Sequence, residues 1–158
     1  MKRVCNAQQL AIAIALVANA SRAVNDQVLE VKKQRLKDFR REVGTVLERK
    51  VDRKRVQERA EVLGDSGTTY KVNFLLLDST ERQPLAYVEP IADQDSVNAK
   101  FREFFDLKSN EDIRSVRRVA VYDDRIDWRQ GDLLMLRQVS SEVLPFGDFP
   151  HRLTKIAA

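Results

Sequence analysis

The hydrophobic positions in the first third of the chain recur at helical spacing. Steps of four and three connect one apolar stripe, interrupted by Ser21, whose members are Leu10, Ile14, Val17, Val24, Val28 and Val31. This is the heptad spacing of one helix face. The stripe resumes with Leu36, Phe39, Val43 and Val46. We therefore predict one helix from about Gln8 to Arg49, with one break allowed, in an N-terminal domain of residues 1–50.

From residue 56 onward the pattern changes to one typical of strands. Two strand-like segments, 55–63 and 69–77, flank the turn signal Asp65-Ser66-Gly67, which predicts an antiparallel pair. A polar segment, 79–83, then leads into a third strand over residues 85–91. Pro90 lies near the end of that strand and predicts a sheet edge or a strand terminus, because proline cannot donate a ladder hydrogen bond.

The remaining residues alternate between helical and strand patterns. We expect a helix from Asp95 or Ser96 to Lys108, a buried strand over 116–124, a helix over 130–139, and a strand over 142–149 that runs into a loop. Such an order predicts a small mixed sheet flanked by helices, in the α/β (α+β) class. Residues 51–158 would form this core domain.

The charges of the chain are unevenly distributed. Residues 1–62 carry 15 Lys and Arg against 8 Asp and Glu, whereas residues 63–158 carry 13 against 16. The segment from Lys32 to Arg59 alone holds 12 basic and 5 acidic residues. A basic excess of this kind predicts either a polyanionic partner or a solvated helix face with mixed charges.

Several classes of chemistry are excluded by composition. The single cysteine, Cys5, cannot form an intramolecular disulfide, and with His151 as the one histidine a zinc site of the usual ligands is not expected. The glycines do not form a phosphate-binding loop. The apolar run from Leu10 to Ala18 is similar to a signal sequence, but polar residues interrupt the approach to it and it is too short to span a bilayer. We expect a cytoplasmic protein with no membrane partner.

Five segments of the chain together form one pattern of residue types: FRREV (39–43), VLGDSGTTYKVNF (62–74), PLAYVEPI (84–91), FREFFDL (101–107) and RRVAVYDD (117–124). Through these segments, residues from about Phe39 onward resemble the PD-(D/E)XK nuclease-like superfamily, in an uncharacterised bacterial and phage branch. The resemblance implies a core made of a helix, a meander of three strands, a crossover helix and a fourth strand.

The same resemblance implies a degenerate active site. Active members place an Asp on the second strand and Glu-x-Lys on the third, and the acids hold Mg²⁺. Here Asn73 occupies the Asp position, Tyr87 the acid position and Glu89 the lysine position. Lys100 would be a migrated base partner and Glu42 an accessory acid. The vestigial candidates are Glu42, Asn73, Glu89 and Lys100, and we expect no metal cofactor.

These observations leave three alternative functions for the protein. The first is a nuclease-fold module that binds nucleic acid without cutting it, through Lys50, Arg53, Lys54, Arg55 and Arg59. The second is a protein-interaction or homodimer module that uses the stripe from Leu10 to Val31. The third is a nuclease with a rearranged site, which would require Mg²⁺ and Glu89. The phage association of the family implies a role in conflict between phage and host.

Overall fold

A computed structural model describes residues 7–158 of the chain. The chain divides into two units, of which the first ends at Arg35 and the second comprises Leu36–Ala158. Helix α1 (Ala7–Lys50) belongs to both, so the predicted long helix is confirmed and it has no break. Among the described residues, no helix combines the length and the apolar character that crossing a bilayer requires.

The second unit is built on a five-stranded mixed sheet with the order β1-β2-β3-β4-β5. Its strands are β1 (Val56–Leu63), β2 (Thr69–Leu77), β3 (Pro84–Ile91), β4 (Arg117–Tyr122) and β5 (Glu142–Pro145). The first three form an antiparallel meander, and the pairs β3–β4 and β4–β5 are parallel. Parallel neighbours need a crossover connection, which α2 (Val97–Ser109) and α3 (Gln130–Val139) provide. The expected mixed α/β class is therefore confirmed.

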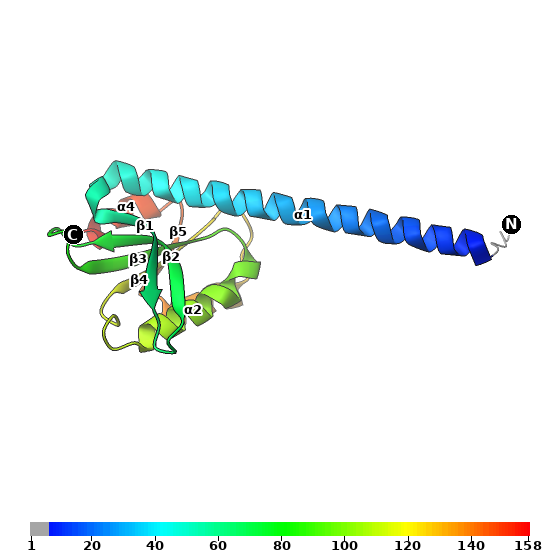
Figure 1. Cartoon of the computed structure of the whole chain (residues 1–158). Coiled ribbons are helices and arrows are strands. Elements are labelled where there is room, and N and C mark those ends of the chain that lie inside the picture. The colour runs from blue at the N-terminus through cyan, green and yellow to red at the C-terminus, as the bar shows by residue number, and fades with distance from the viewer. Residues whose placement is uncertain (1–6) are drawn as a thin grey trace. The chain divides into compact units, whose positions relative to one another are not determined.

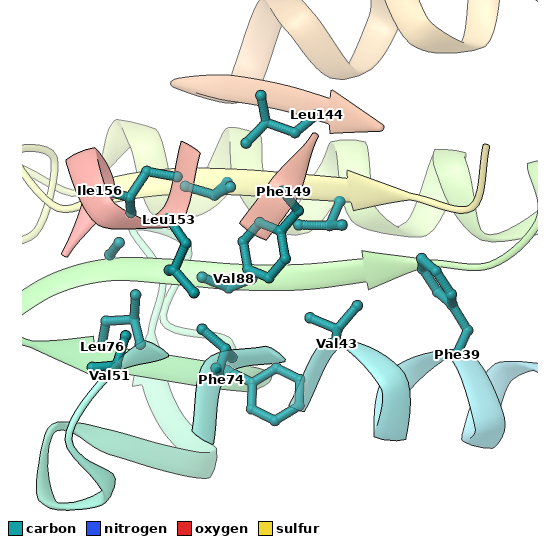
Figure 2. Packing of buried hydrophobic residues seen from close by; sticks show 14 of the residues in the cluster. Phe39, Val43, Val51, Phe74, Leu76, Val88, Leu144, Phe149, Leu153 and Ile156 are labelled. Atoms are coloured by element: carbon teal, nitrogen blue, oxygen red, sulfur yellow. The ribbon is translucent and has the colours of Figure 1, made fainter. Parts of the chain in front are cut away.

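Helices cover both faces of the sheet. On one face, α1 and the last helix, α4 (Phe149–Ile156), pack a core that we call the first core. Figure 2 shows Phe39 and Val43 of α1 and Leu153 of α4 gathered over the same strands. On the opposite face, α2 and α3 pack the second core, and Figure 1 shows α2 on the side of the sheet away from α4. Residues that alternate along a strand contribute to the two cores in turn.

This alternation breaks at one point in the β1–β2 hairpin. The paired residues pass from Glu58 and Phe74 to Ala60 and Val72, and the intervening position, Arg59, has a φ of 53°. Phe74 packs in the first core, yet Val72 packs in the second. The hairpin therefore turns toward α2, where the Ser66 backbone N–H donates to Oδ1 of Asp106 at 2.9 Å.

The C-terminal residues differ from the prediction. β5 ends at Pro145, and the expected loop is instead the eight-residue helix α4. Pro150 lies in its first turn, where a missing N–H costs nothing. The three apolar residues of one face, Phe149, Leu153 and Ile156, are fully buried in the first core, so packing rather than length stabilises this helix.

Of the two alternatives predicted for Pro90, the strand terminus is confirmed and the sheet edge is not, because β3 lies between β2 and β4 and ends at Ile91. β2 pairs with β3 only as far as the partners Phe74 and Val88. Pro90 lies beyond that point, near the end of the strand. The proline is tolerated because one of the two neighbouring strands has already turned away.

Candidate functional site

A buried polar cluster lies between β2, β3 and α2. Glu89 has no exposed surface, and it sits on the second-core side of β3 between Tyr87 and Ile91. Its Oε1 accepts a hydrogen bond from the backbone N–H of Asn73, and its Oε2 accepts one from Nδ2 of Asn73 at 2.6 Å. The ammonium of Lys100 lies 2.6 Å from the same Oε2. The structure therefore brings together three of the four residues that the resemblance implied.

The bend in the hairpin makes this cluster possible. At Arg59 and Asn73 the regular pairing of β1 with β2 is interrupted. The N–H of Asn73 donates to Glu89 instead of to a neighbouring strand. A left-handed φ at Arg59 costs a non-glycine residue about 1–2 kcal/mol, so the surrounding contacts must hold this conformation in place.

Glu103 completes the cluster, which we call the buried quartet: Asn73, Glu89, Lys100 and Glu103. Its Oε2 lies 2.8 Å from Nζ of Lys100, and its Oε1 is buried without a hydrogen-bond partner among the described residues. Burial, and then the charge of Glu89, raise the pKa of Glu103. Burial alone would lower the pKa of Lys100, but the two carboxylates outweigh it and the pKa is raised. Lys100 therefore remains a cation between two acids.

The sequence interpretation missed Glu103, although a signal for it existed. Lys100 and Glu103 are three residues apart on the helix face that carries Val97, Phe104 and Leu107. Charged residues on the apolar side of a helix are seldom buried unless they are paired with each other. Their spacing was therefore itself an indication of an internal ion pair.

The buried quartet does not fit a divalent metal. Both oxygens of Glu89 already accept hydrogen bonds from Asn73, and the Lys100 ammonium touches both carboxylates. Among the described residues, no group of three or more His, Cys, Asp or Glu side chains converges as a metal site would require. Mg²⁺ needs near-octahedral oxygen ligands, and here an ammonium stands where such an ion would have to bind.

Glu42, the fourth vestigial candidate, is not brought to the buried quartet. It lies on α1, which packs against the opposite face of the sheet. Its carboxylate pairs with Arg125 at 3.1 Å, and Arg125 also pairs with the buried Asp123 at 2.7 Å. The Arg125 guanidinium lies 5.8 Å from the ring centroid of Phe39. These contacts tie the segment after β4 to α1 and have no evident catalytic role.

A second feature of the same unit is a basic groove between α1 and the edge strand β1. Its volume is about 320 Å³, and the residues that line it are Lys37, Arg40, Arg41, Gly44, Thr45, Glu48, Glu58, Arg59 and Phe74. Arg53 and Val56 line an adjoining hollow that shares Gly44, Glu48, Glu58 and Phe74. We call the two together the basic groove. Five basic side chains face two acidic ones along it, so its net charge is positive.

Gly44 and Phe74 form the floor of the basic groove. A Cβ atom at Gly44 would meet Cζ of Phe74 at 3.1 Å, so glycine permits α1 to approach this ring closely. The guanidinium of Arg40 lies 5.6 Å from the ring centroid of Phe74 and pairs with Glu58 at 2.7 Å. The floor is thus apolar and its rim is charged, as in many binding grooves.

The predicted nucleic-acid contacts are only partly located at this groove. Arg53 and Arg59 line it, and Lys50 and Lys54 are exposed nearby in sequence. Arg55 is different, because it is half-buried and donates to the carbonyl oxygens of Leu77 at 3.0 Å and Ala157 at 2.6 Å. Arg55 therefore has a structural role in the second unit. The prediction also omitted three α1 residues of the groove: Lys37, Arg40 and Arg41.

No protein-family model, no curated protein and no solved structure matches this chain.

Proposed function

We propose that the second unit is a nucleic-acid-binding module that does not cut its ligand. The observation that carries this proposal is the basic groove, whose five basic side chains come from α1, β1 and the turn between them. Phosphate groups supply most of the affinity in sequence-independent binding, and each one that is neutralised releases counterions. A groove lined by several spaced cations suits a phosphodiester backbone better than a single small anion.

The absence of cleavage is inferred from the state of Glu89. A nuclease carboxylate must reach a metal ion at the scissile phosphate. Glu89 is fully buried, and both of its oxygens are occupied by hydrogen bonds within the chain. The amide of Asn73 brings no charge to hold a cation. The buried quartet is therefore better suited to joining β3 to α2 than to phosphodiester chemistry.

The nuclease-like ancestry of the second unit is part of the same proposal. The order of a helix, three antiparallel strands, a crossover helix and a parallel fourth strand agrees with the core that the resemblance implies. Asn73 on β2, Glu89 on β3 and Lys100 on α2 lie together where such a core would hold its catalytic residues. These two observations support a nuclease fold that has lost its chemistry.

The groove is expected to read the nucleic-acid backbone rather than the bases. Phosphate contacts position a protein on its ligand but carry no sequence information. The rim offers guanidinium and ammonium groups, of which Arg40 and Arg41 also pair with Glu58 and Asp38. Binding should therefore be strongly dependent on salt, and it should show little preference between sequences.

The test is fluorescence anisotropy with a labelled mixed-sequence duplex over a series of salt concentrations. The variant Lys37→Glu, Arg41→Glu, Arg59→Glu should weaken binding at least about tenfold, and each lost phosphate contact should reduce the log–log salt slope by about 0.9. Arg55 is kept, because its reversal would break contacts to the Leu77 and Ala157 carbonyls.

The matched control reverses three exposed basic residues outside the groove, namely Arg114, Arg129 and Arg137. The control variant should bind nearly as the wild type does. Equal losses in both variants would mean that only net charge matters, and unchanged binding in the groove variant would exclude the groove as the contact surface. Incubation of the wild type with Mg²⁺ or Mn²⁺ should leave the duplex intact. Cleavage that Glu89→Ala eliminates would instead support the rearranged nuclease.

A further inference from the structure

The apolar stripe of α1 is exposed along its whole length. Every residue from 10 to 34 is exposed, and the exposed fractions of the stripe residues run from 48% at Val28 to 69% at Val31. Isolated helices gain little stability from propensity alone and normally bury one face. Contiguous apolar surface of this kind marks a binding surface.

We propose that a second copy of this chain covers the stripe, so that the protein forms a dimer through α1. This inference is independent of the proposed nucleic-acid binding, because it involves only residues of the first unit. It rests on the charge, the size and the spacing of the residues on and beside the stripe.

The charge pattern selects a neutral, apolar occupant. The positions that flank the stripe are uncharged: Ala11, Ala13, Ala18, Ala20, Asn25 and Gln27. The charged residues between 10 and 31 are Arg22, Asp26 and Glu30. At heptad spacing these three fall on positions that point away from the stripe. A charged partner could not form ion pairs with the stripe or with the positions that flank it. A second copy instead presents the same apolar and neutral surface.

The small residues beside the stripe favour a facing helix. Ala13, Ile14, Val17 and Ala18 line a shallow hollow whose surface is entirely apolar. In paired helices, a side chain of one helix inserts into a hole between side chains of the other. Alanines at the rim of the hollow allow a partner helix to approach closely.

The size of the stripe suits a reversible dimer. Residues 10–31 extend about 33 Å along the helix at about 1.5 Å per residue. Six aliphatic side chains and the flanking alanines from each copy offer together on the order of 1,000 Å² of apolar area, near the lower limit for a specific interface. We therefore expect a concentration-dependent pair rather than a permanent one.

The charges that follow the stripe select an antiparallel pair. Three basic residues come directly after Val31, at Lys32, Lys33 and Arg35, and Arg35 falls on the next stripe position. A parallel pair would place these cations side by side, which is unfavourable. An antiparallel alignment with Leu10 opposite Val28 of the second copy also sets Ile14 opposite Val24. The same alignment sets Val17 opposite Ser21, the one polar position of the stripe.

The dimer is tested by sedimentation velocity on the full chain, freed of nucleic acid, over a wide range of protein concentration. The wild type should shift from monomer to dimer, and the shift should persist at high salt because the seam is apolar. The variant Val24→Asp, Val28→Asp should remain monomeric. A control that adds two acids away from the stripe, Asn19→Asp with Ala23→Asp, should dimerise as the wild type does. Circular dichroism verifies that both variants remain folded.

Three results would overturn the proposal. These are a wild type that stays monomeric at every concentration, a seam variant that still dimerises, and a control that dissociates as fully as the seam variant. Orientation is tested in a Cys5→Ser background by oxidation. The Leu10→Cys variant should form no disulfide with itself but should form one when mixed with the Val28→Cys variant. A self-linked Leu10→Cys dimer would overturn the antiparallel arrangement.

Discussion

The ammonium of Lys100 lies 2.6 Å from Oε2 of Glu89, a carboxylate with no exposed surface. The same ammonium lies 2.8 Å from Glu103. A buried carboxylate is costly unless it is paired and hydrogen-bonded. Lys100 therefore acts as an internal counter-ion, and it joins β3 to α2.

Removal of this counter-ion should strongly destabilise the protein. Lys100→Met keeps much of the side-chain volume but leaves Glu89 and Glu103 buried without a cation. Breaking a buried pair on one side typically costs about 3–5 kcal/mol. Urea denaturation at neutral pH measures the loss. The control Arg102→Met, at an exposed position of the same helix, should change stability little. A loss no larger than that of the control would show that the ion pair is not needed.

Glu103 should give the protein a specific dependence on pH. Burial and the charge of Glu89 raise its pKa above the ordinary value of 4.5. Between the unfolded and the folded pKa the native state binds more protons, so stability falls as pH rises through that window. Glu103→Gln cannot ionise. The free energy of unfolding of the variant, relative to the wild type, should therefore increase as pH rises from 4.5.

Denaturation curves at several pH values measure this difference. Each unit of pKa shift corresponds to about 1.4 kcal/mol. Glu111→Gln, which also removes one carboxylate but at an exposed site, serves as the control. A difference that stays constant with pH in the Glu103 variant would contradict the expectation.

Two neighbouring arginines should separate binding from stability. Arg53 is exposed and lines the basic groove, whereas Arg55 donates to the carbonyls of Leu77 and Ala157. Arg53→Ala should weaken duplex binding with little effect on unfolding. Arg55→Ala should cost about 1–3 kcal/mol, because it removes charged hydrogen bonds to buried backbone. Anisotropy and denaturation on both variants test this, and the reverse pattern would exclude the assignment.

Two glycines should respond in opposite directions to the same substitution. A Cβ atom would meet nothing within 4 Å at either Gly67 or Gly131, so packing does not distinguish them. Gly67 has a φ of 79°, which costs an L-residue about 1–2 kcal/mol. Gly131 lies in α3, where alanine is favoured over glycine by about 0.5–1 kcal/mol. Gly67→Ala should thus lower the melting temperature and Gly131→Ala should raise it. A common direction would rule out the backbone explanation.

The local pattern of apolar and polar residues was sufficient to predict most helices and strands of the fold. The helical spacing from Leu10 to Val46 predicted α1, and the turn signal at Asp65–Gly67 predicted the β1–β2 hairpin. α3 begins and ends where its pattern does. α4 was missed, because eight residues are too few for periodicity alone to distinguish a helix from a loop. Its three buried residues, Phe149, Leu153 and Ile156, stabilise the helix by packing in the first core, which the sequence of the segment alone does not reveal.

The residues of the candidate site were predictable only in part. Asn73, Glu89 and Lys100 were named from a resemblance in residue type, and the structure brings them into contact. Glu103 was missed because a helix that also carries Phe101 and Phe105 did not show which face is buried. Phe105 is in fact 58% exposed, whereas Lys100 and Glu103 face inward. Arg55 was predicted to contact nucleic acid because it lies in a basic segment. Its actual partners, the carbonyls of Leu77 and Ala157, are 22 and 102 residues away in the chain, so the local sequence does not reveal them.

The sequence by itself determined the elements other than α4, the excess of positive charge near α1 and the apolar stripe, since each depends on residues close together in the chain. Only the tertiary structure decided which charges are buried, because burial depends on what packs against a side chain from distant segments. It placed Lys100 between two acids and buried Glu89 completely. The tertiary structure also bends the β1–β2 hairpin at Asn73. It places Arg53 and Arg59 in the basic groove, whereas Arg55 donates hydrogen bonds to backbone carbonyls.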